Sequence, residues 1–426
     1  MQLDSQQIEA VRTIKGPVCI TAGPGSGKTR VLTERVFYLI NDIGIDPRSI
    51  LAITFTNKAA EEMRTRINKE VIRLPEIRTF HAFAYNALQN HGNLVGLSNN
   101  FAVIEDEKKK KENEVTFDEL LELALELFVK HPDVLKKYQD KFEYVLIDEY
   151  QDTNKIQAEI IDLIVAKHKN ICIVGDPNQA IYGFRGAAPE YFHTFKDRYP
   201  NAKLIELRTN YRSTRNIISA SDALMNVLSN AHRDFHGLKI NITQAETSKQ
   251  EMINIARKVN ELIGGTDMID STDRNYSPGD IGVIYRLNAI GQDLEKVFAQ
   301  ANIPYIRSGE EFDDVRIERH AVSLLTAHAA KGLEFPVVFV IGVEEGIFPY
   351  TQGKHTDLNE EQRILYVALT RAKEELNISH ANKRTLFGKT TDQKQSRFLN
   401  TLPNNLTTTK QLITKLNKKR AQRTLF

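Results

Sequence analysis

Short apolar runs alternate with segments of helical length along most of the chain. Apolar strands separated by helices are typical of parallel sheets that are covered on both faces. The predicted strands are Val18–Thr21, Leu51–Phe55, Tyr144–Ile147, Asn170–Val174, Lys203–Leu207, Ile281–Tyr285, Ser323–Thr326, Val337–Ile341 and Leu376–Ser379. One sheet could hold all of them, but two α/β lobes fit the length better. The pattern therefore predicts an α/β fold with two parallel-sheet lobes.

Breaks in this pattern suggest where the lobes and their insertions lie. Tyr-Pro-Asn at 199–201 precedes a new strand, which gives an N-terminal lobe over 1–203 and a C-terminal lobe over 204–400. A charged run marks a short insertion at about 90–115, and a second polar stretch marks a residual one at about 308–322. The last segment, 401–426, begins rich in Pro, Asn and Thr and is predicted to be a flexible basic tail.

Composition narrows the class of protein. The chain has 426 residues, 41% apolar and 26% charged, with a net charge of only +2, so a polyanionic partner must be held by local basic patches. The polar N-terminus does not resemble a signal peptide, and no apolar run approaches membrane-spanning length. Cys19 and Cys172, each inside a strand-like run, are predicted to be core residues. These features indicate a soluble, cytoplasmic protein without a membrane partner.

The strand Val18–Thr21 runs into a glycine-rich loop that is followed by a helical pattern. Glycines let backbone N–H groups face phosphate oxygens at a helix N-terminus, which favours anions. Lys28 is expected to reach the outer phosphates of a nucleotide, and the Thr29 hydroxyl to bind Mg²⁺. The loop residues expected to hold the nucleotide are Ala22, Gly23, Gly25, Ser26, Gly27, Lys28 and Thr29. Ala22 replaces the usual first glycine, but the strand–loop–helix context still favours a P-loop.

Two further strand ends supply polar groups that phosphate chemistry needs. Asp148 and Glu149 follow an apolar strand; we expect Asp148 to hold Mg²⁺ and Glu149 to deprotonate the attacking water. Gln179 follows the next strand, where a neutral amide can sense the terminal phosphate. Tyr182, Phe184 and Arg185 come directly after it, and such side chains stack on unpaired bases or hold phosphate.

The order of these segments resembles the UvrD/Rep/PcrA family of superfamily 1 DNA helicases. The segments that carry the resemblance are Leu3–Gln7, the P-loop with Arg30, Thr54–Ala60, Thr79–His81, Asp148–Thr153, Gly175–Ala187, Leu207–Ser213, His328–Phe335 and Glu360–Lys373. The resemblance implies two RecA-like lobes with ATP between them. It also implies ATP hydrolysis coupled to 3′–5′ movement along single-stranded DNA, in DNA repair or replication.

Residue roles follow from the same resemblance. Arg212 and Arg371 become arginine fingers; Gln7 reads adenine, Tyr211 stacks on it opposite Arg30, and Glu334 lies between the DNA and nucleotide sites. The residues implied to contact DNA are Phe55, Asn57, Thr79, His81, Tyr182, Phe184, Arg185, His328 and Phe387. Phe184 stands where the family usually has Trp, so we expect weaker stacking on bases.

The chain departs from the family in its insertions. Relatives carry a sizeable helical insertion in each lobe, and here both are much reduced. We therefore expect ATPase activity and single-strand translocation, on single strands or junctions with duplex, more firmly than processive unwinding. A nuclease or other repair partner could supply what is missing.

The last residues, Gln422–Phe426, resemble short peptides that dock on sliding clamps. The alternative is a basic end that binds DNA phosphates. Two other classes of function also remain open for the whole chain. A P-loop kinase or GTPase would explain residues 18–30 but not Gln179, Arg212 or Arg371, and a non-enzymatic DNA-binding subunit would not need an intact ATP site.

Overall fold

The computed structural model describes residues 2–98, 100–104, 111, 113–264, 276–308, 318–351 and 357–412. The chain divides into two compact units, unit 1 (Met1–Tyr211) and unit 2 (Arg212–Phe426). The division falls later than the predicted boundary at 203/204. The reason is that the strand Lys203–Leu207, which we assigned to the second lobe, pairs in parallel with Val18–Ala22 in the sheet of unit 1.

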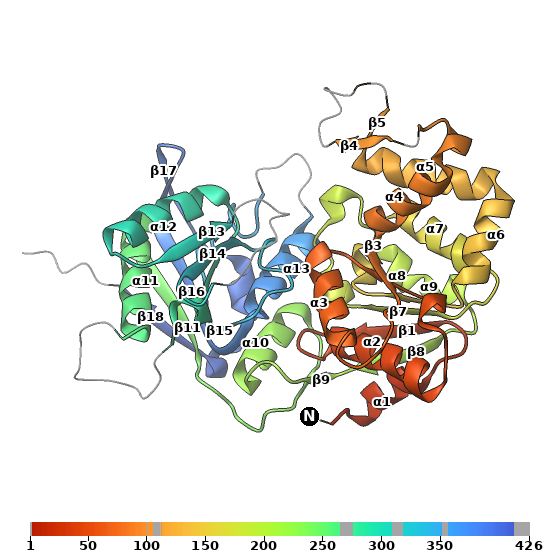
Figure 1. Ribbon diagram of the computed structural model, residues 1–426. Helices are drawn as coiled ribbons and strands as arrows, with labels where there is room; N and C mark the ends of the chain where they lie inside the picture. The colour runs from red at the N-terminus through yellow and green to blue at the C-terminus, as the bar shows by residue number, and fades with distance from the viewer. Residues whose placement is uncertain are drawn as a thin grey trace, which may run out of the picture. The chain divides into compact units, whose positions relative to one another are not determined.

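Unit 1 is built on a parallel sheet of order β3-β2-β6-β7-β1-β8 (Figure 1). Its strands are β1 Val18–Ala22, β2 Ile50–Thr54, β3 Glu76–Thr79, β6 Tyr144–Ile147, β7 Ile171–Gly175 and β8 Lys203–Leu207. Its helices of a full turn or more are α1 Ser5–Arg12, α2 Lys28–Phe37, α3 Asn57–Ile67, α4 Phe80–His91, α5 Phe117–Lys130, α6 Pro132–Lys141, α7 Lys155–Val165, α8 Glu190–His193 and α9 Phe195–Arg198.

Helices cover both faces of this sheet because its central strands are apolar along their whole length. Side chains of α1, α2 and α3 pack on one face in one buried cluster. Side chains of α4, α5 and α7 pack on the other face in a second cluster. Cys19 and Cys172 are both buried in these clusters and free, as predicted. The predicted insertion at 90–115 contains a short parallel pair, β4 Ala102–Ile104 and β5 Glu114–Thr116.

Unit 2 has a larger sheet of order β13-β14-β12-β15-β16-β11-β18, and β17 pairs antiparallel with β16. The strands are β11 Ile240–Thr247, β12 Ile281–Tyr285, β13 Tyr305–Ser308, β14 Val322–Thr326, β15 Phe335–Val340, β16 Ala372–Leu386, β17 Lys389–Asp392 and β18 Thr407–Gln411. The helices are α10 Arg215–Met225, α11 Ser248–Leu262, α12 Asn288–Gln300 and α13 Leu358–Leu369. Two very short strands, β9 Thr209–Asn210 and β10 Asn230–Ala231, lie near the division between the units.

The segment after residue 400 corrects one prediction. Residues 407–411 form β18, which extends the sheet in parallel with β11, and Leu402 is buried. The Pro, Asn and Thr content suggested a linker, but a run of three threonines has high strand propensity and adds readily to an open edge. Residues 413–426, which include the predicted clamp-binding peptide, lie outside the described part of the chain, as do residues 309–317 of the second insertion.

Candidate nucleotide and DNA site

The P-loop is shaped by left-handed glycines between β1 and α2. Gly25 and Gly27 have φ of 69° and 85°, which side chains with a Cβ rarely adopt. The turn brings the Lys28 ammonium group over the start of the loop, where it donates to the carbonyls of Ala22 at 3.0 Å and Gly23 at 3.3 Å. A positive charge and the N-terminus of α2 thus share one concave loop, the arrangement that binds a polyphosphate.

The carboxylates that follow β6 meet this loop. The Thr29 hydroxyl donates to Asp148 Oδ2 at 3.4 Å, although β1 and β6 are separated by β7 in the sheet. Burial, and then repulsion from Glu149, raise the pKa of Asp148 to about 7, while Lys28 opposes the shift. The positive charge of Lys28 thus only partly offsets burial and the repulsion from Glu149. A hydroxyl and a carboxylate at one place are oxygen ligands that Mg²⁺ accepts, so these residues fit the ion.

The grouping of metal-binding side chains among the described residues bears on how this ion would be held. Within the described ranges, no cluster of three or more His, Cys, Asp or Glu side chains could hold a metal by itself. Mg²⁺ is usually held by one or two carboxylates together with phosphates and water, so a dedicated cage is not needed.

Glu149 and Gln179 lie at the ends of adjacent strands. Glu149 has φ of 52°, a left-handed backbone that is uncommon outside glycine and recurs at functional sites. Gln179 is buried and donates through Nε2 to Asp176 Oδ2 at 2.6 Å. Burial raises the pKa of Asp176, while Lys28 and Gln179 oppose the shift. The structure therefore brings Lys28, Thr29, Asp148, Glu149 and Gln179 to the carboxyl edge of β1, β6 and β7.

The residues expected around adenine also assemble within unit 1. Gln7 is buried, donates from Nε2 to the Ser26 carbonyl at 2.9 Å, and closes a capping box with Asp4. The Tyr211 hydroxyl donates to Asp4 Oδ2 at 2.6 Å, and the Tyr211 amide donates to the Gly25 carbonyl at 2.9 Å. Burial and that bond to Asp4 raise the pKa of Tyr211 to about 12. Arg30 lies in the first turn of α2, 3.9 Å from Glu34.

Comparison with known proteins agrees with this arrangement. The UvrD/REP helicase N-terminal domain matches residues 3–111 and 105–200, and the UvrD-like helicase C-terminal domain matches residues 205–313 and 308–383. The chain belongs to the UvrD/REP helicase family. Among its relatives are the ATP-dependent DNA helicases PcrA of Staphylococcus aureus (strain MRSA252) and Staphylococcus epidermidis (strain RP62A).

These relatives are distant and longer. The S. aureus protein is 27% identical over 643 residues, covering 95% of this chain and 86% of that protein. The S. epidermidis protein is 26% identical over 642 residues, covering 95% and 87%. Because both alignments are longer than the 426-residue chain, the relatives carry long segments that have no counterpart here.

The family's DNA-facing aromatics are unequally exposed in unit 1. Phe55, just after β2, stacks on Tyr182 with ring centroids 5.1 Å apart. Tyr182 is only 7% exposed and lies 6.1 Å from Phe184, which is 55% exposed. Of the three aromatics, Phe184 is thus the most exposed, and its ring contacts that of Tyr182. The side chain of Arg185 lies outside what the structure describes.

A second group of predicted DNA contacts lies at the start of α4. Thr79 caps this helix by accepting from the Ala82 amide, and His81 follows in the first turn. The His81 ring meets Phe117 edge-to-face at 5.3 Å. Phe117 is partly exposed at the start of α5 and was missed by the sequence analysis. Only its place directly after a capping Thr could have drawn attention to it. Asn57 opens α3 and is exposed.

Unit 2 holds the remaining predicted residues. Arg212 forms an ion pair with Glu334 at 2.6 Å, and Lys373 forms another with Glu334 at 2.6 Å. Burial opposes the ionised form of Glu334, but Arg212 and Lys373 together keep its pKa below the ordinary value. Arg371 is buried and donates to the carbonyls of Val367 at 2.8 Å and Leu333 at 3.2 Å. Arg212, Glu334 and Arg371 thus share one region of unit 2.

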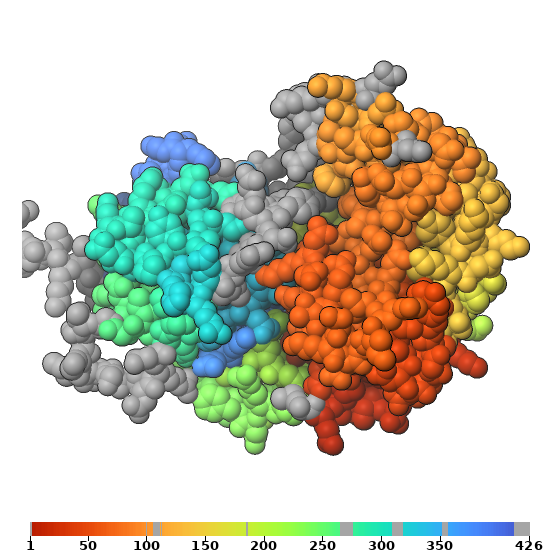
Figure 2. Space-filling view, viewed as in Figure 1, coloured from red at the N-terminus to blue at the C-terminus, as the bar shows by residue number. Residues whose placement is uncertain are grey.

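The other two residues of unit 2 differ in exposure. His328 is buried just after β14, so its ring offers little surface to a strand of DNA. Phe387 is 89% exposed, with φ of 52°, at the turn of the β16–β17 hairpin. This hairpin projects from unit 2 (Figures 1 and 2). An aromatic ring held on a projecting turn is available for contact.

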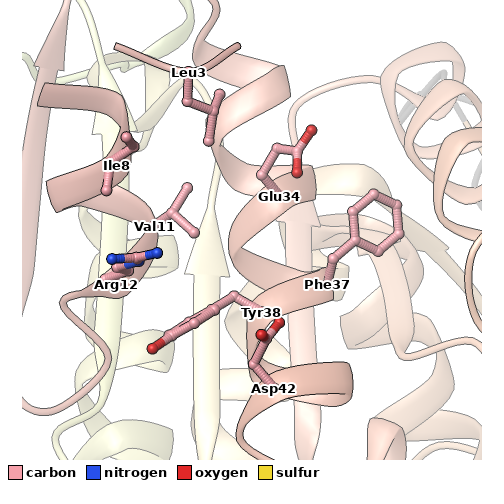
Figure 3. A pocket seen from close by; sticks show the side chains of 8 residues that line it. All are labelled: Leu3, Ile8, Val11, Arg12, Glu34, Phe37, Tyr38 and Asp42. Atoms are coloured by element: carbon pink, nitrogen blue, oxygen red, sulfur yellow. The ribbon is translucent and has the colours of Figure 1, made fainter. Parts of the chain in front are cut away.

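A hollow of about 240 Å³ between α1 and α2 is separate from the nucleotide residues (Figure 3). Its walls mix apolar and charged side chains, among them Ile8, Val11, Phe37, Arg12, Glu34 and Asp42. None of the predicted phosphate or metal residues lines it, so we do not include it in the site. In the part of the chain that the structure describes, no helix is long and apolar enough to cross a membrane.

Proposed function

We propose that this protein is an ATP-dependent DNA helicase whose core activity is translocation along single-stranded DNA. One observation carries the proposal: the P-loop lysine, the Thr29–Asp148 pair, Glu149 and Gln179 lie together at the carboxyl edge of three neighbouring strands. Membership of a helicase family and the names of its relatives support the same conclusion. An intact ATP site argues against a DNA-binding subunit without activity.

The proposed site residues of unit 1 have different roles in ATP hydrolysis. The loop 22–29 and Lys28 bind the phosphates, and Glu149 accepts the proton of the attacking water. Thr29 and Asp148 would hold Mg²⁺, which would supply positive charge to the phosphate oxygens. Gln179 contacts the terminal phosphate and couples the presence of this phosphate to the segment that contains Tyr182 and Phe184. Gln7, Arg30 and Tyr211 hold the adenine.

Unit 2 contributes positive charge to the same reaction. Arg212 and Arg371 approach the terminal phosphate when ATP closes the two lobes, and Glu334 positions Arg212 through its ion pair. ATP then favours the closed state by its differential affinity for it. Support for this step comes from the family resemblance and from the common region that Arg212, Glu334 and Arg371 share in unit 2.

Single-stranded DNA binds through aromatic faces and polar helix ends. Phe184, backed by Tyr182 and Phe55, stacks on bases, and Phe387 is a further contact on unit 2. Asn57, Thr79, His81 and Arg185 complete the proposed set, and the family resemblance adds His328, although its ring is buried here. The family also implies movement in the 3′–5′ direction. Repeated closure of the lobes then moves the strand by small steps, in DNA repair or replication.

The reduced insertions limit what the protein does alone. Both family models match in two pieces that meet at 105–111 and 308–313, close to the two predicted insertions. This supports placing the segments missing from this chain there. We propose that translocation is autonomous, and that processive unwinding at junctions with duplex depends on a partner such as a nuclease.

The tail is proposed to bind a sliding clamp through Gln422–Phe426. A pull-down with clamp would compare the full chain with one that ends at Arg420. Retention of the full chain alone supports the proposal. Equal retention of both chains rejects it and leaves a basic segment that binds DNA phosphates.

The test of the main proposal is steady-state ATP hydrolysis with and without single-stranded DNA. Lys28→Ala serves as the inactive form, and Lys155→Ala, an exposed lysine of α7, as the matched control. We expect strong stimulation by DNA in the unmodified protein and in Lys155→Ala, and none in Lys28→Ala. Hydrolysis indifferent to DNA would favour another P-loop enzyme. DNA binding without hydrolysis would favour a non-enzymatic subunit.

A further inference from the structure

Gln151 lies two residues after Glu149, and its side chain is completely buried. Its Nε2 donates to Glu149 Oε2 and, at 3.4 Å, to Asp152 Oδ2. Its Oε1 accepts from the Asp176 amide at 2.9 Å. A flipped amide would place its NH₂ group against a backbone N–H and its oxygen against two carboxylates. The surrounding groups therefore fix which end of the amide faces Glu149.

The slot around this amide is closed by the strand that follows. A Cβ on Gly175 would lie 2.3 Å from Gln151 Oε1 and 2.9 Å from the Phe192 ring. Gly175 ends β7, the direct neighbour of β6, and Asp176 comes next in the chain. Gln151 thus connects the segment after β6 to the segment after β7 through a contact for which only glycine leaves room.

The backbone conformation of Glu149 bears on the role of the Gln151–Glu149 hydrogen bond. Its left-handed conformation is stabilised locally, since its amide donates to Asp148 Oδ1 at 3.0 Å and its carbonyl accepts from the Asp152 amide at 2.9 Å. Both of these bonds are made by main-chain atoms of Glu149. The bond from Gln151 restrains the Glu149 carboxylate, which must hold one position to accept a proton from water.

The other end of Gln151 reaches the segment that contains the phosphate-sensing glutamine. The amide of Asp176 donates to Gln151, and its carboxylate accepts from Gln179 at 2.6 Å. A continuous hydrogen-bonded path therefore runs from Glu149 through Gln151 and Asp176 to Gln179. Tyr182 and Phe184 follow a few residues later in the chain.

We infer that Gln151 is a positioning residue that holds the Glu149 carboxylate in place and ties it to the Asp176–Gln179 turn. The inference rests on the proposed function, because it assigns Gln151 a task within ATP hydrolysis. Because Gln151 is fully buried and bonded to the proposed base, we expect its loss to lower the rate of hydrolysis more than the binding of ATP.

The test replaces Gln151 by Met, which keeps the volume but removes both polar ends. Positioned bases contribute about 10²–10⁴-fold, so we expect kcat with single-stranded DNA to fall roughly 10–100-fold. KM for ATP should stay within about threefold, because uniform binding is unchanged. The matched control is Gln157→Met, a buried glutamine whose side chain accepts from the Asn154 amide in the capping box of α7. It should keep kcat within about twofold, since it lies outside the reacting groups.

A double-mutant cycle separates positioning from general damage. In a Glu149→Gln background, measured in single-turnover conditions, Gln151→Met should lower the residual rate by less than about threefold, because residues that act as a unit are not additive. Circular dichroism checks that each variant is folded. If Gln151→Met cannot be obtained folded, Gln151→Asn withdraws the amide from Glu149 and carries the same expectations.

Each result has one meaning. Loss of kcat in Gln151→Met alone, absent in the Glu149→Gln background, supports the inference. Unchanged kcat, equal loss in Gln157→Met, or full additivity with Glu149→Gln overturns it while the proposed function stands. A lack of DNA-stimulated hydrolysis in the unmodified protein overturns the proposed function, and this inference with it.

Discussion

Replacing Arg384 by Met is expected to destabilise unit 2 strongly. Arg384 is fully buried on β16 and pairs with two equally buried carboxylates, Glu251 of α11 and Glu344 after β15. Its Nε donates to Glu344 Oε2 at 2.7 Å, and its Nη2 donates to Glu344 Oε1 at 2.5 Å. The variant would leave both carboxylates without the cation. Removing one partner of a buried pair costs about 3–5 kcal/mol in the free energy of unfolding.

The charges of Arg384, Glu251 and Glu344 predict how the loss of stability in Arg384→Met depends on pH. One guanidinium serves two carboxylates, so burial prevails at Glu344 and raises its pKa despite Arg384. The pKa of Arg384 is also raised; burial opposes this, but attraction to both carboxylates prevails. A carboxylate whose pKa is raised in the folded state favours folding at low pH, and this contribution is lost as pH rises through the folded value. The cost of Arg384→Met should therefore shrink as pH falls from 8 to 5.

Urea and thermal denaturation followed by circular dichroism would measure this effect. About 3–5 kcal/mol corresponds to a decrease in Tm of roughly 10 °C for a unit of this size. The control is Arg397→Met, which removes an exposed pair with Glu345 at 2.7 Å and should leave the denaturation midpoint unchanged. Adding Glu251→Gln and Glu344→Gln to Arg384→Met should restore part of the stability. A loss no greater than the control, or one that grows as pH falls, would refute this reasoning.

Three further predictions concern the site. Phe184→Ala should raise the Kd for single-stranded DNA about tenfold, because one stacked base contributes roughly 1–3 kcal/mol. Phe184→Trp should lower this Kd. Equal Kd values for all three proteins in fluorescence anisotropy would place the DNA elsewhere. Gly175→Ala should reduce DNA-stimulated ATPase activity, because its methyl group displaces Gln151; an unchanged rate would show that the slot adapts. Asp148→Asn should raise the Mg²⁺ concentration needed for half-maximal hydrolysis by at least about tenfold, and an unchanged Mg²⁺ titration would place the ion on other ligands.

Much of the fold could be predicted because buried parallel strands are apolar along their length. Runs such as Tyr144–Ile147 and Ile281–Tyr285 need no alternation, and the structure contains a strand at each predicted run. Strands at the sheet edges were harder to predict. Glu76–Thr79 is mixed in polarity and was not predicted as a strand. Thr407–Gln411 is largely exposed and was predicted to belong to a flexible tail. Membership of β8 in the first sheet depends on a long-range pairing, which no local pattern contains.

The residues of the candidate site also differ in how far they could be predicted from the sequence. Residues that meet a substrate occur in recognisable local patterns, because a P-loop or a carboxylate at a strand end has the same chemical requirement wherever it occurs. Residues that support them depend on the fold around them. Gln151 contacts Asp176 across 25 positions in the sequence, and Arg384 reaches Glu251 across 133. Both could be found only once the strands were placed side by side.

The buried supports also suggest why a short chain can retain the core activity. The hydrogen bonds described above for Glu149 and Gln179 join the segments that follow β6 and β7. The two ion pairs of Glu334 are formed with Arg212 and Lys373 of unit 2. The residues that make these five contacts lie outside the insertion at 90–115 and outside the stretch at 308–322. We therefore expect a chain with reduced insertions to keep these contacts of the hydrolysis site.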